Sequence, residues 1–282
     1  MMTIQKPGII ALSMALLALQ SPAEEAGPSA EEIAKELANP NTALASLNFK
    51  NQFRWFDGDL PNADGQFGFT TLFQPVFPFP LGNGDQIIFR PALPLLIDQP
   101  VYNPARLDFD SESGLGDLVF DLIYAGSGDK GIIWAAGIVS TVPTATAGNL
   151  GGGQWSIGPE ILIGQVTEDY VIGVLPSHQW DVGGWGDSQV NVSSAQVFAT
   201  FLPGGGWNVG TSPIMSYNWD SGEWTIPLNL SFGKTVMWGD TPWKISAEVN
   251  YYIERPDAFG PEWMVGINFA PVVENVMAGW FR

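Results

Sequence analysis

The side chains best suited to chemistry in this sequence are charged residues that alternate with apolar ones. Eight of them, four basic and four acidic, fall on the polar side of segments with a period of two. Charges at that spacing can line an aqueous passage, bind a charged ligand or pair with one another. The eight candidates are Lys50, Arg54, Arg90, Lys244, Asp117, Asp121, Glu160 and Glu248.

Two of these candidates can be placed relative to each other. If segments 86–97 and 114–125 form a hairpin in full register, Arg90 lies opposite Asp121. A cross-strand ion pair narrows an enclosed passage and avoids an unpaired buried charge. Two interpretations stay open: Arg90, Asp121 and Asp117 form a constriction, or they only hold the strands together.

Nucleophilic catalysis with a histidine base would need His178, because the sequence has one histidine. Ser177 cannot be its nucleophile, since adjacent residues of a strand point to opposite faces. Ser193 or Ser194 on the next strand could reach it, but the sequence has no Gly-x-Ser-x-Gly elbow. A hydrolase is therefore the third interpretation, and we expect no enzymatic activity and no catalytic residue.

The composition excludes several classes of site. With no cysteine, the chain cannot form disulfides, zinc–thiolate sites or iron–sulfur clusters, and one histidine excludes multi-histidine metal or haem sites. The formal net charge of −18 repels phosphate backbones, so we expect no nucleic-acid binding. No cofactor and no metal are implied.

The first residues have the pattern of a targeting segment. Lys6 precedes an apolar run from Ile9 to Leu19, and Ser21-Pro22-Ala23 supplies small residues for cleavage. We therefore assign residues 1–23 to a signal peptide and expect export. Residues 24–45 are predicted to be a periplasmic lead-in with a short helix, and residues 46–282 the folded domain.

From Leu47 onward, apolar and polar residues alternate with a period of two. In 243–251, Trp, Ile, Ala, Val and Tyr alternate with Lys, Ser, Glu and Asn, which is typical of a strand with one apolar face. The segments are about ten residues long, the length that a tilted strand needs to cross a bilayer. The twelve predicted strands lie near 46–56, 66–77, 86–97, 114–125, 131–142, 154–164, 170–180, 189–201, 207–217, 224–236, 243–253 and 263–270.

A soluble β-sandwich also shows this alternation, but other features favour a membrane barrel. The connections alternate between long polar loops, such as 98–113, and short turns, such as 126–130. The polar faces are rich in Ser, Asn, Gln and Gly, whereas soluble surfaces are rich in Lys and Glu. Aromatic residues occur at strand ends, as a membrane girdle requires: Trp55, Trp155, Tyr217, Trp224, Trp243, Tyr251 and Trp263. The predicted fold is an all-β, single antiparallel transmembrane barrel of about 12 strands.

Negative charge is concentrated in the predicted long loops. They carry fourteen acidic residues, and only Arg106 and Arg255 oppose them. The loops could attract cations or bridge divalent ions to lipopolysaccharide, or they could serve only to keep exposed segments solvated. The inward set, with four charges of each sign, is predicted to be close to neutral.

Several motifs carry a resemblance to a known family. They are Ser140-Thr141-Val142-Pro143-Thr144-Ala145-Thr146, Trp155-Ser156-Ile157-Gly158-Pro159, Ser212-Pro213-Ile214, Trp224-Thr225-Ile226-Pro227-Leu228 and Glu254-Arg255-Pro256. From about residue 38 to 270 the chain resembles the bacterial outer-membrane proteins of the MetA pathway of phenol degradation. The resemblance implies an outer-membrane channel or transporter, in some cases for aromatic compounds. It brings no established binding residues.

The end of the chain departs from the usual barrel pattern. The barrel-assembly machinery commonly reads an aromatic residue at the end of the last strand, but here Pro271 to Arg282 follow Phe269. Either the last strand runs closer to Phe281 with a bulge at Pro271, or the signal is internal.

Together these features predict a porin-like protein of the Gram-negative outer membrane, exported through a cleaved signal peptide. We expect it to pass small solutes, with aromatic or hydrophobic compounds as candidates. Its expected partners are outer-membrane lipid, lipopolysaccharide, the assembly machinery and the solute. The alternative is a closed structural or surface-interaction barrel that acts through its acidic loops.

Overall fold

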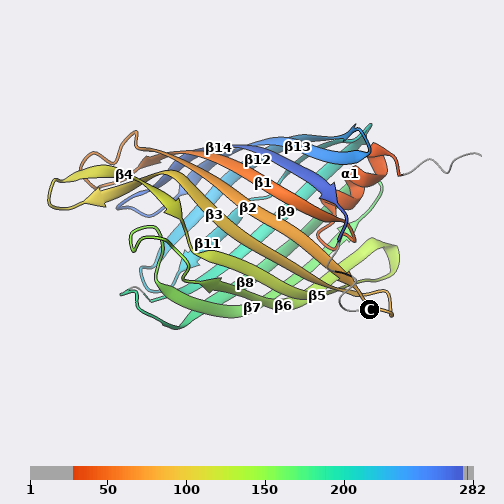
Figure 1. Ribbon diagram of the computed structural model, residues 1–282, viewed down its shortest axis with the longest axis horizontal. Helices are drawn as coiled ribbons and strands as arrows, with labels where there is room; N and C mark the ends of the chain where they lie inside the picture. Colours follow the sequence, from red (N-terminus) through yellow and green to blue (C-terminus); the bar gives the residue numbers. More distant parts are fainter. Residues whose placement is uncertain (1–27, 188, 276–277, 279–282) are drawn as a thin grey trace, which may run out of the picture.

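Figure 1 shows a closed β-barrel in the computed structural model, which describes residues 28–187, 189–275 and 278. The predicted signal peptide and Phe281 lie outside the described residues. All strand segments belong to one antiparallel sheet. They are β1 (Ala45–Asp57), β2 (Phe67–Pro80), β3 (Gln86–Asn103), β4 (Asp108–Leu115), β5 (Leu118–Ser127), β6 (Ile132–Val142), β7 (Gln154–Val166), β8 (Tyr170–Gly184), β9 (Asn191–Gly204), β10 (Trp207–Thr211), β11 (Ile214–Asn218), β12 (Glu223–Trp238), β13 (Thr241–Glu254) and β14 (Gly260–Val273).

Two consecutive pairs of segments are pieces of one strand. β4 and β5 are interrupted only at residues 116–117, and both pair with β3. β10 and β11 are interrupted at Ser212 and Pro213, and both run between β9 and β12. Proline has no backbone N–H for the ladder, which accounts for the second break. The fourteen segments therefore form twelve wall strands, which confirms the predicted antiparallel barrel and its strand number.

β1 and β14 close the barrel. Trp55 lies opposite Trp263, and Ala45 lies opposite Val273. The last strand therefore continues through Pro271, beyond its predicted end at residue 270. Closure leaves no strand edge with unpaired backbone groups, as a wall in lipid requires.

The outward side of the wall is apolar. Ile163 is 61% exposed and Leu230 is 59% exposed, as expected for side chains that face hydrocarbon. The exposed aromatic residues form two girdles, one with Trp55, Trp155, Trp180, Trp224 and Trp263, the other with Tyr170, Trp134, Trp207 and Trp238. Within the described ranges, no helix is long and apolar enough to span a membrane.

The interior near the second girdle is packed with apolar side chains. They come from inward positions of β3 and β5 to β9, and Ala38 packs against them. The cluster consists of Ile88, Ile123, Ala125, Ile133, Ala135, Leu162, Val171, Leu175 and Phe198. At this end, the inner side of these strands therefore carries a packed apolar core.

A short helix, α1 (Ala30–Ala38), lies at this same end, which we call the helix end (Figure 1). Ser29 caps it: the Ser29 hydroxyl accepts from the Glu32 backbone N–H, and the Glu32 carboxylate accepts from the Ser29 N–H. The Ser29 backbone N–H and the Ser29 hydroxyl both donate to the Glu32 carboxylate, and these two bonds hold the pKa of Glu32 below its usual value. The helix contacts β9, β10, β12 and β13, and Ile33 and Ala34 are buried.

The chain between α1 and β1 then reaches the opposite side of the wall. The Asn41 side-chain amide donates to the carbonyl oxygens of Gly126, at 2.9 Å, and Trp134, at 3.1 Å. Gln86 on β3 donates to the Asn41 carbonyl oxygen. Residues 30–44, which we call the N-terminal plug, therefore extend across the helix end of the barrel from β9–β13 to β3–β6.

The predicted loop at 98–113 is not a loop. β3 continues to Asn103 and β4 starts at Asp108, so the two form a hairpin that projects beyond the wall (Figure 1). It rises from the end opposite α1, which we call the hairpin end. Phe109 packs on Phe259, with ring centroids 4.5 Å apart, and ties the hairpin to the β13–β14 loop. The hairpin therefore lies outside the barrel, at the opening of the hairpin end, and does not fold into the interior.

We expect Asn41→Ala to loosen the N-terminal plug without unfolding the barrel. The variant loses the two hydrogen bonds from the Asn41 side chain, a cost of about 1–3 kcal/mol in total, so tryptic cleavage after Lys35 should accelerate roughly tenfold. Asn62→Ala is the control, because Asn62 donates to the Leu107 carbonyl at the hairpin end. Equal cleavage rates in both variants would contradict the role of Asn41.

Candidate functional site

Strand alternation directs the candidate charges into the interior. On β1, Phe53 and Trp55 face outward with the girdle, so Lys50 and Arg54 face inward. The Arg54 guanidinium donates to the Thr70 hydroxyl at 3.3 Å and to the side-chain oxygen of Gln52. Arg54 is therefore held against the wall by neighbouring polar side chains.

Arg90 and Asp121 form an ion pair across β3 and β5. The two residues are directly opposite each other, in the predicted register, with a nitrogen–oxygen distance of 3.0 Å. Glu160 on β7 approaches the same guanidinium nitrogen at 3.8 Å. The side chains are 15%, 13% and 6% exposed for Arg90, Asp121 and Glu160, so the triad is mostly shielded from solvent.

Arg90, Asp121 and Glu160 do not use all of their hydrogen-bonding atoms. The Nε of Arg90 and the Oε2 of Glu160 are buried and have no hydrogen-bond partner within the described residues. One guanidinium therefore faces two carboxylates, and the arrangement retains hydrogen-bonding capacity that the protein itself does not use.

Asp117 lies apart from this triad. Its carboxylate accepts backbone N–H bonds from Ala145, at 3.0 Å, and Gly152, at 2.7 Å. A Cβ at Gly151 would lie 2.5 Å from both Asp117 carboxylate oxygens, so glycine is needed there. Asp117 therefore ties the β6–β7 loop to the wall at the hairpin end, a contact that strand alternation could not indicate.

On the other side of the interior, Glu248 is held by amides. Its two carboxylate oxygens accept from Asn229, at 3.2 Å, and Asn268, at 3.0 Å. Asn229 also donates to Asn250 at 3.0 Å. The sequence reasoning missed this asparagine ladder, although all three residues occupy polar positions of the alternating strands.

Lys244 occupies the inward face of β13, four residues before Glu248. It pairs in register with Thr235 of β12 and with Ala270 of β14. The structure thus brings Arg90, Asp121 and Glu160 together, places Lys50, Lys244 and Glu248 in a second group around β14, and separates Asp117 from both.

His178 and Ser193 meet on the outer face of the barrel, where β8 pairs with β9. The Nδ1 of His178 lies 2.8 Å from the Ser193 Oγ, and the indole N–H of Trp219 donates to that oxygen at 2.9 Å. The buried Nε2 of His178 has no partner among the described residues. The pair has a nucleophile–base contact, and the Trp180 ring packs against the imidazole, but no carboxylate or amide among the described residues binds the second ring nitrogen.

The hairpin end carries an acidic hollow of about 280 Å³, formed by the β1–β2 and β13–β14 loops. Asp57, Asp59, Glu254 and Asp257 line it, and Arg255 forms an ion pair with Asp57. In the part of the chain that the structure describes, no group of three or more acidic or histidine side chains is placed to hold a metal ion.

No family model matches the chain, and no curated protein matches it. Among solved structures, it is similar to the COG4313 outer membrane channel from Pseudomonas putida F1, with a TM-score of 0.60, 13% identity, and coverage of 82% of this chain and 94% of that chain. It is also similar to the NanC porin, with a TM-score of 0.51, 11% identity, and coverage of 81% and 99%. At these identities the likeness shows a shared barrel fold.

Removing the shared cation of the triad should destabilise the barrel. We expect Arg90→Ala to cost about 3–5 kcal/mol, because Asp121 and Glu160 become unpaired buried carboxylates. The measurement is the temperature at which the folded band is lost on a heat-modifiability gel. Arg106→Ala is the control, since the exposed Arg106–Asp110 pair should contribute about 0–1 kcal/mol. Equal shifts in both variants would contradict this assignment.

Proposed function

We propose that this protein is an outer-membrane channel or transporter for small solutes. The observation that carries the proposal is a closed barrel with an apolar, aromatic-girdled exterior and charged side chains on its inward face. A structural barrel needs no inward cations, since apolar residues would pack its interior at lower desolvation cost. The two similar structures, a channel and a porin, support the same conclusion.

The proposed route runs from the hairpin end to the helix end. The hairpin end would face the cell exterior, because the long loops lie there, and the helix end would face the periplasm. The polar triad and the asparagine ladder line the outer part, whereas the apolar cluster and the N-terminal plug cover the periplasmic part. Passage would therefore require displacement of the plug, which makes the channel gated.

The proposal includes how the protein reaches the outer membrane and what it meets there. Export would use cleavage of residues 1–23, and the assembly machinery would insert the barrel. The acidic loops, including the hollow around Asp57 and Glu254, would meet lipopolysaccharide through divalent cations. We also propose, from its sequence motifs, that the protein belongs to the MetA-pathway family and that aromatic compounds are candidate solutes. The triad of Arg90, Asp121 and Glu160 would form the constriction of the channel.

The second candidate is a closed barrel that acts only through its surface loops. It is favoured by the apolar cluster and the plug, which both occupy the helix end of the barrel. The two candidates differ in conductance, because a gated channel opens at least transiently and a packed barrel never does.

A hydrolase is favoured by a single contact, the 2.8 Å distance between His178 and Ser193. A serine nucleophile also needs an oriented base and donors for the developing oxyanion. Among the described residues, no hydrogen bond to the Nε2 of His178 orients this base.

We expect reproducible single-channel steps when the refolded protein is inserted into a planar bilayer. Asn41→Ala should raise the open fraction, because the plug loses its attachment to Gly126 and Trp134. The measurement is the open probability of wild type and variant at the same voltage. A folded barrel that never conducts, in either form, would exclude the channel.

We expect no ester hydrolysis from the His178–Ser193 pair. Short-chain acyl esters and phospholipids in mixed micelles should be hydrolysed at the background rate, and His178→Ala should behave like wild type. A rate above background that disappears in His178→Ala would establish the hydrolase instead.

A further inference from the structure

Lys50 and Lys244 stand on the two sides of one strand. β14 lies between β1 and β13, and Lys50 pairs in register with Asn268 while Lys244 pairs with Ala270. Residues two apart on a strand point to the same face, so both lysines flank the same inward stretch of β14. Glu248 pairs in register with Gly266 on the same face of that stretch.

Neither ammonium group has a partner. Four ion pairs within 4.0 Å are found in residues 28–187, 189–275 and 278, and they use only arginine cations. No hydrogen bond involves the Nζ of Lys50 or Lys244, and neither atom is among the buried unpartnered ones. Both ammonium groups therefore retain hydrogen-bonding capacity that the described residues do not use.

The carboxylate of Glu248, on the same stretch of wall as the two lysines, already accepts hydrogen bonds from other side chains. Glu248 accepts from Asn229 and Asn268, and its side chain lies across Gly266, where a Cβ would come within 2.7 Å of the Glu248 Cγ. The two asparagine amides fix the carboxylate against the wall, so it reduces the local positive charge without forming an ion pair with either lysine.

The interior carries fewer negative charges than the eight inward candidates of the sequence suggest. Asp117 accepts loop N–H groups at the hairpin end, which leaves Asp121, Glu160 and Glu248 against four inward cations. The acidic loops are distant: Asp57 is seven residues from Lys50 along β1, about 24 Å at strand rise. That is about three Debye lengths at physiological salt, so the loops hardly reduce the positive potential at Lys50.

We propose that Lys50 and Lys244 form an anion-binding subsite in the barrel interior, and that the solutes are small oxyanions carrying a carboxylate or phosphate group. The inference rests on the proposed channel function and adds its substrate class. It reverses the cation preference that a net charge of −18 suggests, because the charge at the narrow interior governs selectivity.

The test is the reversal potential of the refolded protein in a planar bilayer under a potassium chloride gradient. Wild type should prefer anions, and Lys50→Gln/Lys244→Gln should lose this preference. Lys50→Arg/Lys244→Arg should keep it. Lys234→Gln is the matched control, since Lys234 lies over the Trp207 ring and faces away from the interior. Heat-modifiability gels confirm that each variant is folded.

Binding is measured independently by calorimetry with acetate and with inorganic phosphate, and the tighter of the two identifies the oxyanion class. The Gln double variant should bind about tenfold more weakly, which corresponds to about 1.4 kcal/mol. Conductance with unchanged anion preference in that variant overturns the subsite and leaves the channel intact. Absent conductance with lysine-dependent binding overturns the channel and supports the subsite. Absent or lysine-independent binding overturns the subsite.

Discussion

The structure depends on one constraint: a strand wall in hydrocarbon must pair every backbone N–H and C=O within itself. The β1–β14 seam meets that requirement, because it pairs the first strand with the last along their whole length, from Ala45–Val273 to Asp57–Gly260. Once the sheet closes, strand alternation leaves each side chain only two environments, lipid or the enclosed interior. The apolar residues face the lipid, and the charged residues must all lie in the enclosed interior.

The crowded interior explains how the charges are arranged. Arg90 serves two carboxylates, Glu248 is held by asparagines, and Asp117 is used to fix a loop. Among the described residues, each of these carboxylates has a partner, whereas Lys50 and Lys244 have none. Because Asp117 lies at the hairpin end, three carboxylates face four inward cations, so the interior is more positive than the even count in the sequence indicates.

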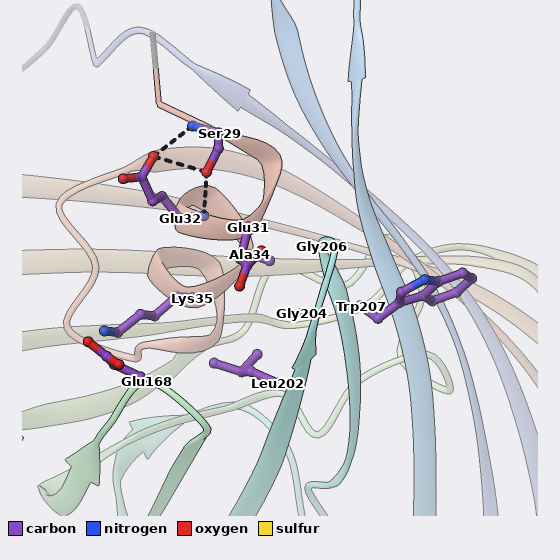
Figure 2. Close-up of a pocket in the computed structure, with 10 residues that line it drawn as sticks. All are labelled: Ser29, Glu31, Glu32, Ala34, Lys35, Glu168, Leu202, Gly204, Gly206 and Trp207. Carbon is purple, nitrogen blue, oxygen red and sulfur yellow. Dashed lines mark hydrogen bonds between the residues drawn. The ribbon is translucent and has the colours of Figure 1, made fainter. Parts of the chain in front are cut away.

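The helix end adds a second level of control. The N-terminal plug has few polar attachments to the wall. The Asn41 amide donates to two carbonyls, Gln86 donates to the carbonyls of Asn41 and Thr42, and the Glu31 carboxylate accepts from the Gly205 N–H at 3.3 Å. Figure 2 shows α1 beside the β9–β10 turn, with Glu31 near Gly204 and Gly206. An attachment made of a few hydrogen bonds can be released without disturbing the barrel, since the wall does not depend on it.

By itself, the sequence determined the fold class, the twelve strands, the aromatic girdles and the alternation of outward and inward positions along each strand. All of these follow from a period of two, which is a local property of the chain. Even the Arg90–Asp121 pair could be predicted, because neighbouring strands joined by a connection share a register. Only the tertiary structure decided that 98–113 is a hairpin, that Asp117 holds a loop, and that the plug crosses the helix end. These depend on contacts between segments distant in sequence, and no local pattern records which distant partner a side chain meets.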